Sequence, residues 1–182
     1  MEPSEDQAHI ERVKAGDPLA YAFLVDKYKN MAFTIALKVT GNREEAEDVA
    51  QEGFVKAYQQ LGSFAGRSKF STWLYTIVYR TALNHRHKNR NHPFSLDAQA
   101  DRQPAADTTP AHEQLQAKQE QQYVKAAIDQ LPPTEALLVT LYYLDENSTR
   151  EIGEITGMSL ANIKIKLFRA RKRLEKELAF LL

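Results

Sequence analysis

Apolar residues along this chain recur every three or four residues, the spacing of one face of an α-helix. No segment keeps the strict alternation of apolar and polar residues that is typical of a half-buried strand. Ser4 and Asn42 are expected to cap the first and third helices. The pattern predicts an all-α fold, with helices over residues 5–15, 18–40, 43–61, 70–88, 113–130, from 134, 149–156 and 160–178.

Side chains and glycines mark the ends of the last two helices. Ser148 and Glu151 form a capping box, in which each side chain binds the backbone N–H of the other residue. Gly157 then ends this helix, and Ser159 caps the next. Two helices joined by a short turn containing glycine predict a helix-turn-helix motif, whose second helix enters the major groove of DNA.

The second helix of this motif is apolar on one side and basic on the other. Residues 164–176 contain seven Lys or Arg residues and one acidic residue. Ile165 and Phe168 lie among the basic residues, where they suit contacts to thymine methyl groups or to another protein. The alternative is a solvated charged face with two incidental apolar residues. The apolar stripe, which is expected to pack on the preceding helix, is Ile163, Leu167, Ala170, Leu174 and Leu178.

A polar segment divides the chain. Residues 91–112 contain three prolines among Asn, Asp, Gln, Thr and Ala residues, a composition typical of a flexible linker. The sequence therefore predicts two small helical domains, over residues 1–90 and 113–182, joined by this linker.

The third predicted helix has two dissimilar faces. Glu44, Asp48 and Glu52 are four residues apart, so three carboxylates line up and repel one another by a few tenths of a kcal/mol per pair. A basic partner surface would relieve this repulsion, and the alternative is an ordinary solvated face. A carboxylate-bridged metal site needs Glu-x-x-His pairs, which are absent here. The opposite, buried face is expected to consist of Ala46, Val49, Ala50, Ala57 and Leu61.

The fourth predicted helix and the loop before it interleave aromatic and basic residues, as proteins that bind single-stranded DNA do. Arg80, Asn84 and His87 form a polar face without an acid. The competing interpretation assigns Phe70, Trp73 and Ile77 to the core, and both are expected to hold in part, with Trp73 mostly packed and Lys69, Arg80 and Asn84 outward. His85, His87 and His92 do not favour a metal site, because residues two apart do not share a helix face. The interleaved residues include Phe64, Arg67, Lys69, Phe70, Trp73, Tyr75, Tyr79 and Arg80.

Composition narrows the function classes. The net charge is zero, with 24 basic and 24 acidic residues, which argues against a protein that coats nucleic acid indiscriminately. Residues 67–96 nevertheless contain six Lys or Arg residues and no acid. Cysteine is absent, which excludes disulfides and Cys-based zinc sites. No apolar run reaches the ~18 residues of a membrane span, and the acidic N-terminus is unlike an export signal, so a cytoplasmic protein without membrane insertion is expected.

Three segments, in order, resemble the small bacterial sigma factors called extracytoplasmic-function (ECF) sigma factors. Glu47–Tyr58, with the sequence EDVAQEGFVKAY, resembles their polymerase-binding helix. Phe70–Asn84, which begins FSTWLY, resembles their promoter-melting helix. Leu131–Leu178, with LFRAR at 167–171, resembles their C-terminal helix-turn-helix. The resemblance covers nearly the whole chain and implies a sigma factor that directs RNA polymerase to promoters and assists their melting.

The resemblance also implies partners and roles for individual residues. Core RNA polymerase would be bound through the coiled-coil clamp of its largest subunit, by Asp48, Gln51, Glu52, Phe54 and Val55. The melted upstream-ten element, with one base flipped into a pocket at the loop, would be bound by Phe64, Arg67, Lys69, Trp73, Arg80 and Asn84. The duplex upstream-thirty-five element would be read by Lys164, Ile165, Phe168, Arg169, Arg171 and Lys172. An anti-sigma factor is the expected inhibitor. Arg80 and Ile165 depart from the residues common in the family, so the promoter sequence itself is not predicted.

Two other classes of function are weighed against this interpretation. A stand-alone helix-turn-helix regulator would account for the C-terminal helices but would leave the acidic stripe and the aromatic, basic helix unexplained. An enzyme lacks support, because no paired acid and base, glycine-rich phosphate loop or nucleophile motif is found. The sequence therefore predicts no catalytic residue, cofactor or metal.

Overall fold

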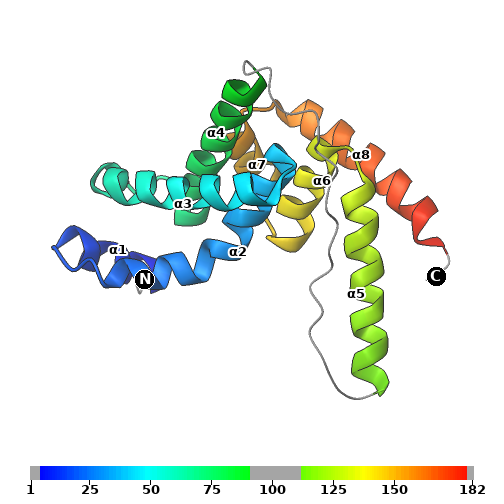
Figure 1. Cartoon of the computed structure of the whole chain (residues 1–182), viewed down its shortest axis with the longest axis horizontal. Helices are drawn as coiled ribbons and strands as arrows, with labels where there is room; N and C mark the ends of the chain where they lie inside the picture. Colours follow the sequence, from blue (N-terminus) through cyan, green and yellow to red (C-terminus); the bar gives the residue numbers. More distant parts are fainter. Residues whose placement is uncertain (1–4, 91–111, 180–182) are drawn as a thin grey trace. The chain divides into compact units, whose positions relative to one another are not determined.

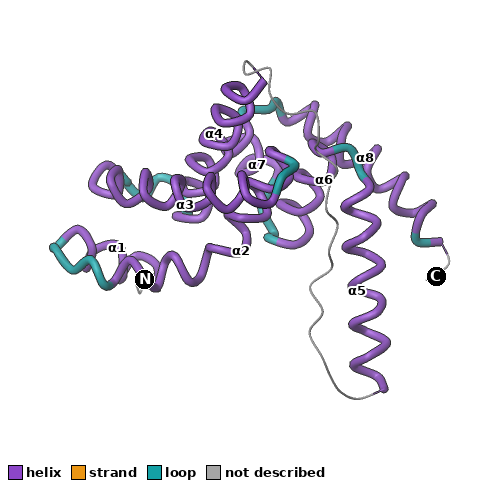
Figure 2. Tube along the Cα trace, in the orientation of Figure 1, coloured by secondary structure: helices purple, strands orange, loops and turns teal. Residues whose placement is uncertain are grey.

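The computed structural model describes residues 5–90 and 112–179, and side chains only for 5–88 and 121–179. Every regular element in these two stretches is helical (Figures 1 and 2), which confirms the all-α fold. The chain forms two units, one with α1 to α4 and the other with α5, α6, α8 and most of α7. The predicted linker at 91–112 lies outside the described residues except for His112, which is the first residue of α5. Ser4, the predicted first cap, also lies outside them.

The N-terminal unit consists of four α-helices and one short 3-10 helix. Helices α2, α3 and α4 pack against one another, and α1 packs along α2. Their shared core is built from small and branched apolar side chains such as Leu24, Ile35, Val49 and Leu74, each inaccessible to solvent. The elements are α1 (Glu5–Lys14), α2 (Ala20–Thr40), α3 (Arg43–Gln60), η1 (Leu61–Ser63) and α4 (Phe70–Arg90).

Local capping explains where α2 ends and α3 begins. Gly41 has φ 76°, a left-handed conformation, and its N–H donates to the Leu37 carbonyl, so it terminates α2. Asn42 follows in extended conformation, and its side-chain oxygen accepts the Glu45 N–H at 3.0 Å. Both ends were predicted, and both are confirmed. The start of α2 differs by two residues, because Pro18 lies in a turn that precedes the helix.

The C-terminal unit has its own core. Helix α6 packs on α8, and α5 contacts both. Helix α6 continues into a five-residue π-helix, η2, in which the Asp145 N–H donates to the Thr140 carbonyl at 3.2 Å. The sequence did not predict this π-helix. The elements are α5 (His112–Gln130), α6 (Pro133–Val139), η2 (Thr140–Leu144), α7 (Thr149–Thr156) and α8 (Leu160–Glu177).

Candidate nucleic-acid interface

The helix-turn-helix is held by the predicted capping box and by a close turn. The Glu151 N–H donates to Ser148 Oγ at 3.2 Å, and the Ser148 N–H donates to Glu151 Oε2 at 2.8 Å. Gly157 has φ 74°, and Ser159 Oγ accepts the Asn162 N–H at 3.4 Å to begin α8. These contacts set where α7 begins, where the turn lies and where α8 begins, as the sequence predicted.

The α8 face comprises the six residues predicted to read duplex DNA, and all six are exposed. Phe168 is 61 % and Ile165 is 51 % exposed, so two large apolar side chains stand in solvent among cations. Lys164 and Arg169 have no ion-pair partner among the side chains that the structure describes, those of residues 5–88 and 121–179. The predicted apolar stripe turns away from this face, with Ile163, Leu167 and Ala170 buried and Leu174 and Leu178 half-buried. The face consists of Lys164, Ile165, Phe168, Arg169, Arg171 and Lys172.

Some basic residues of α8, including Arg171 of the α8 face, contact neighbouring groups. Arg173 Nη1 binds Glu135 Oε2 at 3.0 Å, and Glu135 is buried at the start of α6, so Arg173 joins α8 to α6. The Arg171 guanidinium lies 5.6 Å from the centre of the Tyr143 ring, within range of a cation–π contact. Arg173 is therefore structural, although the sequence alone could not separate it from the other cations.

The surface of α3 that is predicted to bind polymerase, named the docking face, comprises Asp48, Gln51, Glu52 and Val55, which are all exposed. Val55 is 56 % exposed. Phe54, which was expected to be part of this surface, is only 8 % exposed and belongs to the core. Its backbone carbonyl accepts the Tyr21 hydroxyl at 2.8 Å, which ties α3 to α2. The predicted buried face, from Ala46 to Leu61, is confirmed.

A lysine on the same helix relieves part of the repulsion in the acidic stripe. Lys56 Nζ lies 2.7 Å from Glu52 Oε1, and this hydrogen bond and the lysine charge hold the pKa of Glu52 below its usual value. Lys56 also donates to Thr81 Oγ1 on α4 at 3.3 Å. Asp48 has no ion-pair partner in the described part of the chain. Of the two carboxylates on the docking face, Asp48 is therefore the one whose charge no described cation neutralises.

The loop-α4 face comprises the exposed residues Arg67, Lys69, Arg80 and Asn84. Trp73, also predicted to bind the opened strand and expected to be mostly packed, is half-buried. Phe64 is a correction, because it is 6 % exposed and its ring packs against Phe70 and Trp73, with ring centres 5.8 and 5.1 Å apart. Its side chain therefore belongs to the core, where it packs against α4.

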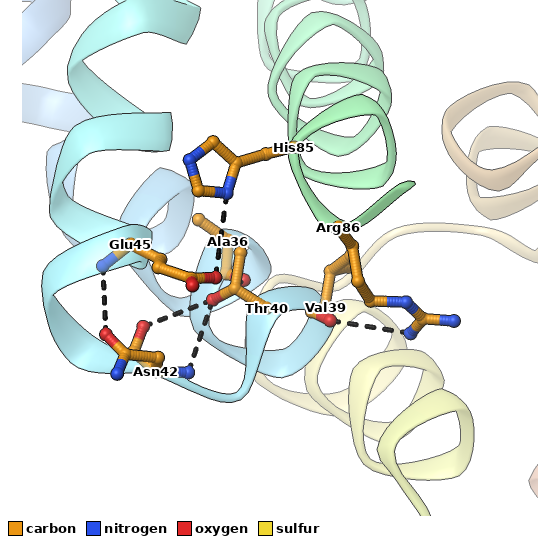
Figure 3. Close-up of polar contacts among 7 residues, drawn as sticks. All are labelled: Ala36, Val39, Thr40, Asn42, Glu45, His85 and Arg86. Atoms are coloured by element: carbon orange, nitrogen blue, oxygen red, sulfur yellow. Dashed lines mark hydrogen bonds and ion pairs between the residues drawn. The ribbon is translucent and has the colours of Figure 1, made fainter. Parts of the chain in front are cut away.

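A polar cluster that sequence reasoning missed joins α4 to α3 and to the end of α2. Figure 3 shows His85 of α4 pointing at Glu45 of α3, with Nδ1 3.6 Å from Oε2. Arg86 donates to the Val39 carbonyl at 3.5 Å, and Thr40 Oγ1 donates to the Asn42 carbonyl at 3.1 Å (Figure 3). Residues about forty positions apart are brought together, and no local pattern could have shown it.

Two negative findings concern the described residues only. Among the side chains described, those of residues 5–88 and 121–179, no three His, Cys, Asp or Glu residues are grouped as metal ligands would be. His92, one of the histidines considered above, lies outside these ranges. No helix there combines the length and the apolar character that spanning a bilayer requires.

Comparison with known proteins agrees with this geometry. Residues 24–92 match the family described as Sigma-70 region 2, and residues 121–174 match Sigma-70, region 4. The ECF RNA polymerase sigma factor SigW of Bacillus subtilis is 33% identical over 177 residues, which cover 93% of this chain and 94% of SigW. The chain belongs to the ECF sigma factors. The ECF sigma-E factor of Haemophilus influenzae is also 33% identical to this sigma factor, over 95% of each chain.

Solved structures share the fold of this sigma factor. The sigma factor RpoE of Bartonella quintana, crystallised with the anti-sigma factor NepR, matches with a TM-score of 0.68 at 20% identity. The match covers 87% of this chain and 96% of that one. CnrH, in complex with the cytosolic domain of CnrY, matches with a TM-score of 0.62 at 19% identity, over 94% of this chain and 96% of CnrH. As an ECF sigma factor, the protein binds RNA polymerase, directs it to promoter DNA and takes part in transcription initiation.

Proposed function

We propose that this sigma factor divides its work among the docking face, the loop-α4 face and the α8 face. Residues 1–90 bind core polymerase and the melted upstream-ten element, and residues 113–182 bind the duplex upstream-thirty-five element. Residues 91–112 connect the two parts of the chain, so that weak contacts at both ends combine through effective concentration. The observation that carries the proposal is the charge segregation: one acidic face and two basic faces in a chain of zero net charge.

The α8 face suits paired DNA. Exposed Lys and Arg residues neutralise phosphates and set the register of the helix in the groove, while side chains that reach base edges select the sequence. Ile165 and Phe168 offer apolar contact area at positions where the fold does not need it. Apolar contact to a thymine methyl group is one of the few ways a base is read without a hydrogen bond.

The loop-α4 face suits opened DNA. Arg67, Lys69 and Arg80 present cations for the phosphates of a single strand, and the half-buried Trp73 offers part of a ring for stacking. Each stacked base contributes ~1–3 kcal/mol, which offsets part of the cost of unpairing. The sigma factor therefore assists melting by holding bases that have already left the duplex.

The docking face suits a basic partner surface with a small apolar contact. Asp48 supplies a carboxylate without an internal cation in the described chain, and Val55 supplies apolar area beside it. The coiled-coil clamp of the polymerase's largest subunit is the proposed partner. Docking also places the loop-α4 face, because Lys56 and His85 join α3 to α4.

Regulation and location follow from the same proposal. An anti-sigma factor would hold the protein inactive, as the shared fold with a sigma factor crystallised with NepR supports. RNA polymerase acts on the chromosome, so the protein works in the cytoplasm. Nucleotide addition stays with the polymerase, and the sigma factor contributes no catalytic group or cofactor.

Run-off transcription with purified core polymerase tests the proposal directly. Templates carrying randomised promoter sequences are transcribed with and without the protein, and the transcripts are sequenced from their starts. We expect start sites at fixed positions downstream of two selected elements, only when the protein is present. Tight binding to a palindromic duplex without polymerase, together with no selected starts, would instead identify a stand-alone regulator.

A further inference from the structure

Helix α1 contacts the first residue of the loop that we assign to promoter opening. Lys14 Nζ, at the end of α1, donates a hydrogen bond to the Phe64 carbonyl at 2.8 Å. Fifty residues separate the two groups in the chain. Helix α1 packs on η1 as well as on α2, and Figure 1 shows it beside α2. The Sigma-70 region 2 match begins at residue 24, so α1 lies outside that matched segment.

Phe64 is held at its amide, its ring and its carbonyl. Its N–H donates to the Leu61 carbonyl at 3.0 Å, which closes η1. Its ring packs against Phe70 and Trp73 of α4. Lys14 supplies the third contact, at the carbonyl. Among the described residues, it is the only one of these partners that lies outside the segment from η1 to α4.

The other end of α1 is tied to the same aromatic cluster. Asp6 accepts hydrogen bonds from Lys27 Nζ at 2.6 Å and from the Tyr28 hydroxyl at 2.5 Å. The Tyr28 ring centre lies 5.6 Å from that of Phe70. Both ends of α1 therefore contact the group of aromatic residues beneath the loop, one through a side chain of that group and the other through its backbone.

We infer that α1 is a positioning element for the recognition loop, with Lys14 as its key residue. The Phe64 carbonyl is the last anchored backbone group before Ala65 and Gly66, which are exposed, and Gly66 has φ 68°. Fixing that carbonyl fixes the direction in which the chain enters the loop, and hence where Arg67 and Lys69 stand. Lys14 acts through the loop and does not itself contact DNA. This inference rests on the proposed role of the loop-α4 face.

Lys14→Met removes the ammonium and keeps the apolar stem, while Lys14→Arg keeps a cationic donor. Lys29→Met is the control, because Lys29 is an exposed lysine of α2 that pairs with Asp26. Each variant is assembled with core polymerase. Fluorescence anisotropy then measures binding of a labelled single-stranded oligonucleotide selected on the wild-type holoenzyme, and of copies with one base changed. Core affinity and the thermal midpoint of the free protein are measured alongside.

We expect Lys14→Met to weaken binding of the selected oligonucleotide roughly three- to tenfold. It should also reduce the discrimination against a changed base at the position held by the loop. Core affinity and the thermal midpoint should match those of Lys29→Met, and Lys14→Arg should restore most of the affinity.

Unchanged affinity and base preference in Lys14→Met would overturn the inference. So would a loss of core affinity and thermal midpoint in parallel with the DNA effect, since that pattern marks general destabilisation. A wild-type holoenzyme that binds no single-stranded oligonucleotide selectively would remove the proposed role of the face itself, and the inference with it.

Discussion

Gly53 of α3 lies against Val78 of α4 so closely that a Cβ atom added to the glycine would stand 2.8 Å from Val78 Cγ2. The same atom would be 3.4 Å from Val78 Cα, so the obstacle includes backbone. Valine is also stiff at χ1, which leaves it little room to turn away. Helix α3 is therefore pressed onto α4 at a point where only a hydrogen atom fits.

Gly53→Ala is expected to lower the free energy of unfolding, although alanine favours helix over glycine by about 1 kcal/mol. Overpacking costs about 1–3 kcal/mol, and here it requires the two helices to move apart. We expect a net loss of about 1–2 kcal/mol in urea unfolding of the free protein. Gly62→Ala is the control, because an added Cβ there meets nothing within 4 Å. A Gly53→Ala protein as stable as the Gly62→Ala protein would contradict this packing.

The pKa of Glu52 should depend on Lys56. Because the folded pKa of Glu52 is lowered, the stabilisation from the pair is complete above the ordinary pKa of the unfolded chain, about 4.5. It is lost as the pH falls through the lower folded value. Lys56→Met should raise the pKa of Glu52 toward its usual value, as followed by carboxyl carbon NMR. Asp17, whose pKa is lowered by Arg12, serves as the internal control and should not change. A Glu52 titration unaffected by Lys56→Met would mean that the pair does not form in solution.

Asp48→Lys should abolish binding to core polymerase and leave the fold intact. The side chain is exposed, so its reversal costs little stability, but it places a cation against the basic surface proposed to bind it. Co-purification with core polymerase and circular dichroism measure the two properties. Asp26→Lys on α2, also exposed, is the matched reversal and should bind normally. Retention of polymerase by the Asp48→Lys protein would exclude α3 as the docking helix.

Sequence alone predicted those features that neighbouring residues decide. The caps at Asn42, Ser148 and Ser159 and the turn at Gly157 are confirmed, because each depends on atoms within a few residues of the helix end. The exposure of Ile165 and Phe168 is confirmed for a similar reason, since helical periodicity is local.

Features that depend on tertiary contacts were not predicted. In α4, Phe70 is buried as expected, but Trp73 and Ile77 are only half-buried, and Leu74 and Val78 take the central positions. Helix α4 packs against α2 and α3 together, so its buried face depends on two partners that its own sequence does not specify. The burial of Phe54 and Phe64 and the pairing of His85 with Glu45 have the same origin.

Arg169→Ala should weaken duplex promoter binding by the holoenzyme and lower its salt dependence. Removing one cation from a DNA phosphate reduces the slope of log K against log salt by about one. Arg169 is exposed on the α8 face, and no ion pair within the described residues holds it in the protein. Binding is measured at several salt concentrations on the same duplex. Lys125→Ala on α5 removes another exposed cation, which lies outside the face, and should leave the slope unchanged. An Arg169→Ala slope equal to that of the wild type would place this side chain away from the phosphates.

Phe168 should contribute to base recognition, and its removal should leave the slope of log K against log salt unchanged. Its ring is 61 % exposed, so Phe168→Ala should change the free energy of unfolding by less than about 0.5 kcal/mol. If the ring contacts a thymine methyl, replacing thymines one at a time by deoxyuridine should cost the wild-type holoenzyme about threefold to fourfold in affinity at one position. The Phe168→Ala holoenzyme should show no such cost at that position, whereas the Arg169→Ala holoenzyme should show it in full. If Phe168 contacts a methyl group, removing the ring must abolish the preference of the holoenzyme for thymine at that position. Equal sensitivity of the wild-type and Phe168→Ala proteins to every deoxyuridine would instead mean that the exposed ring serves a protein contact.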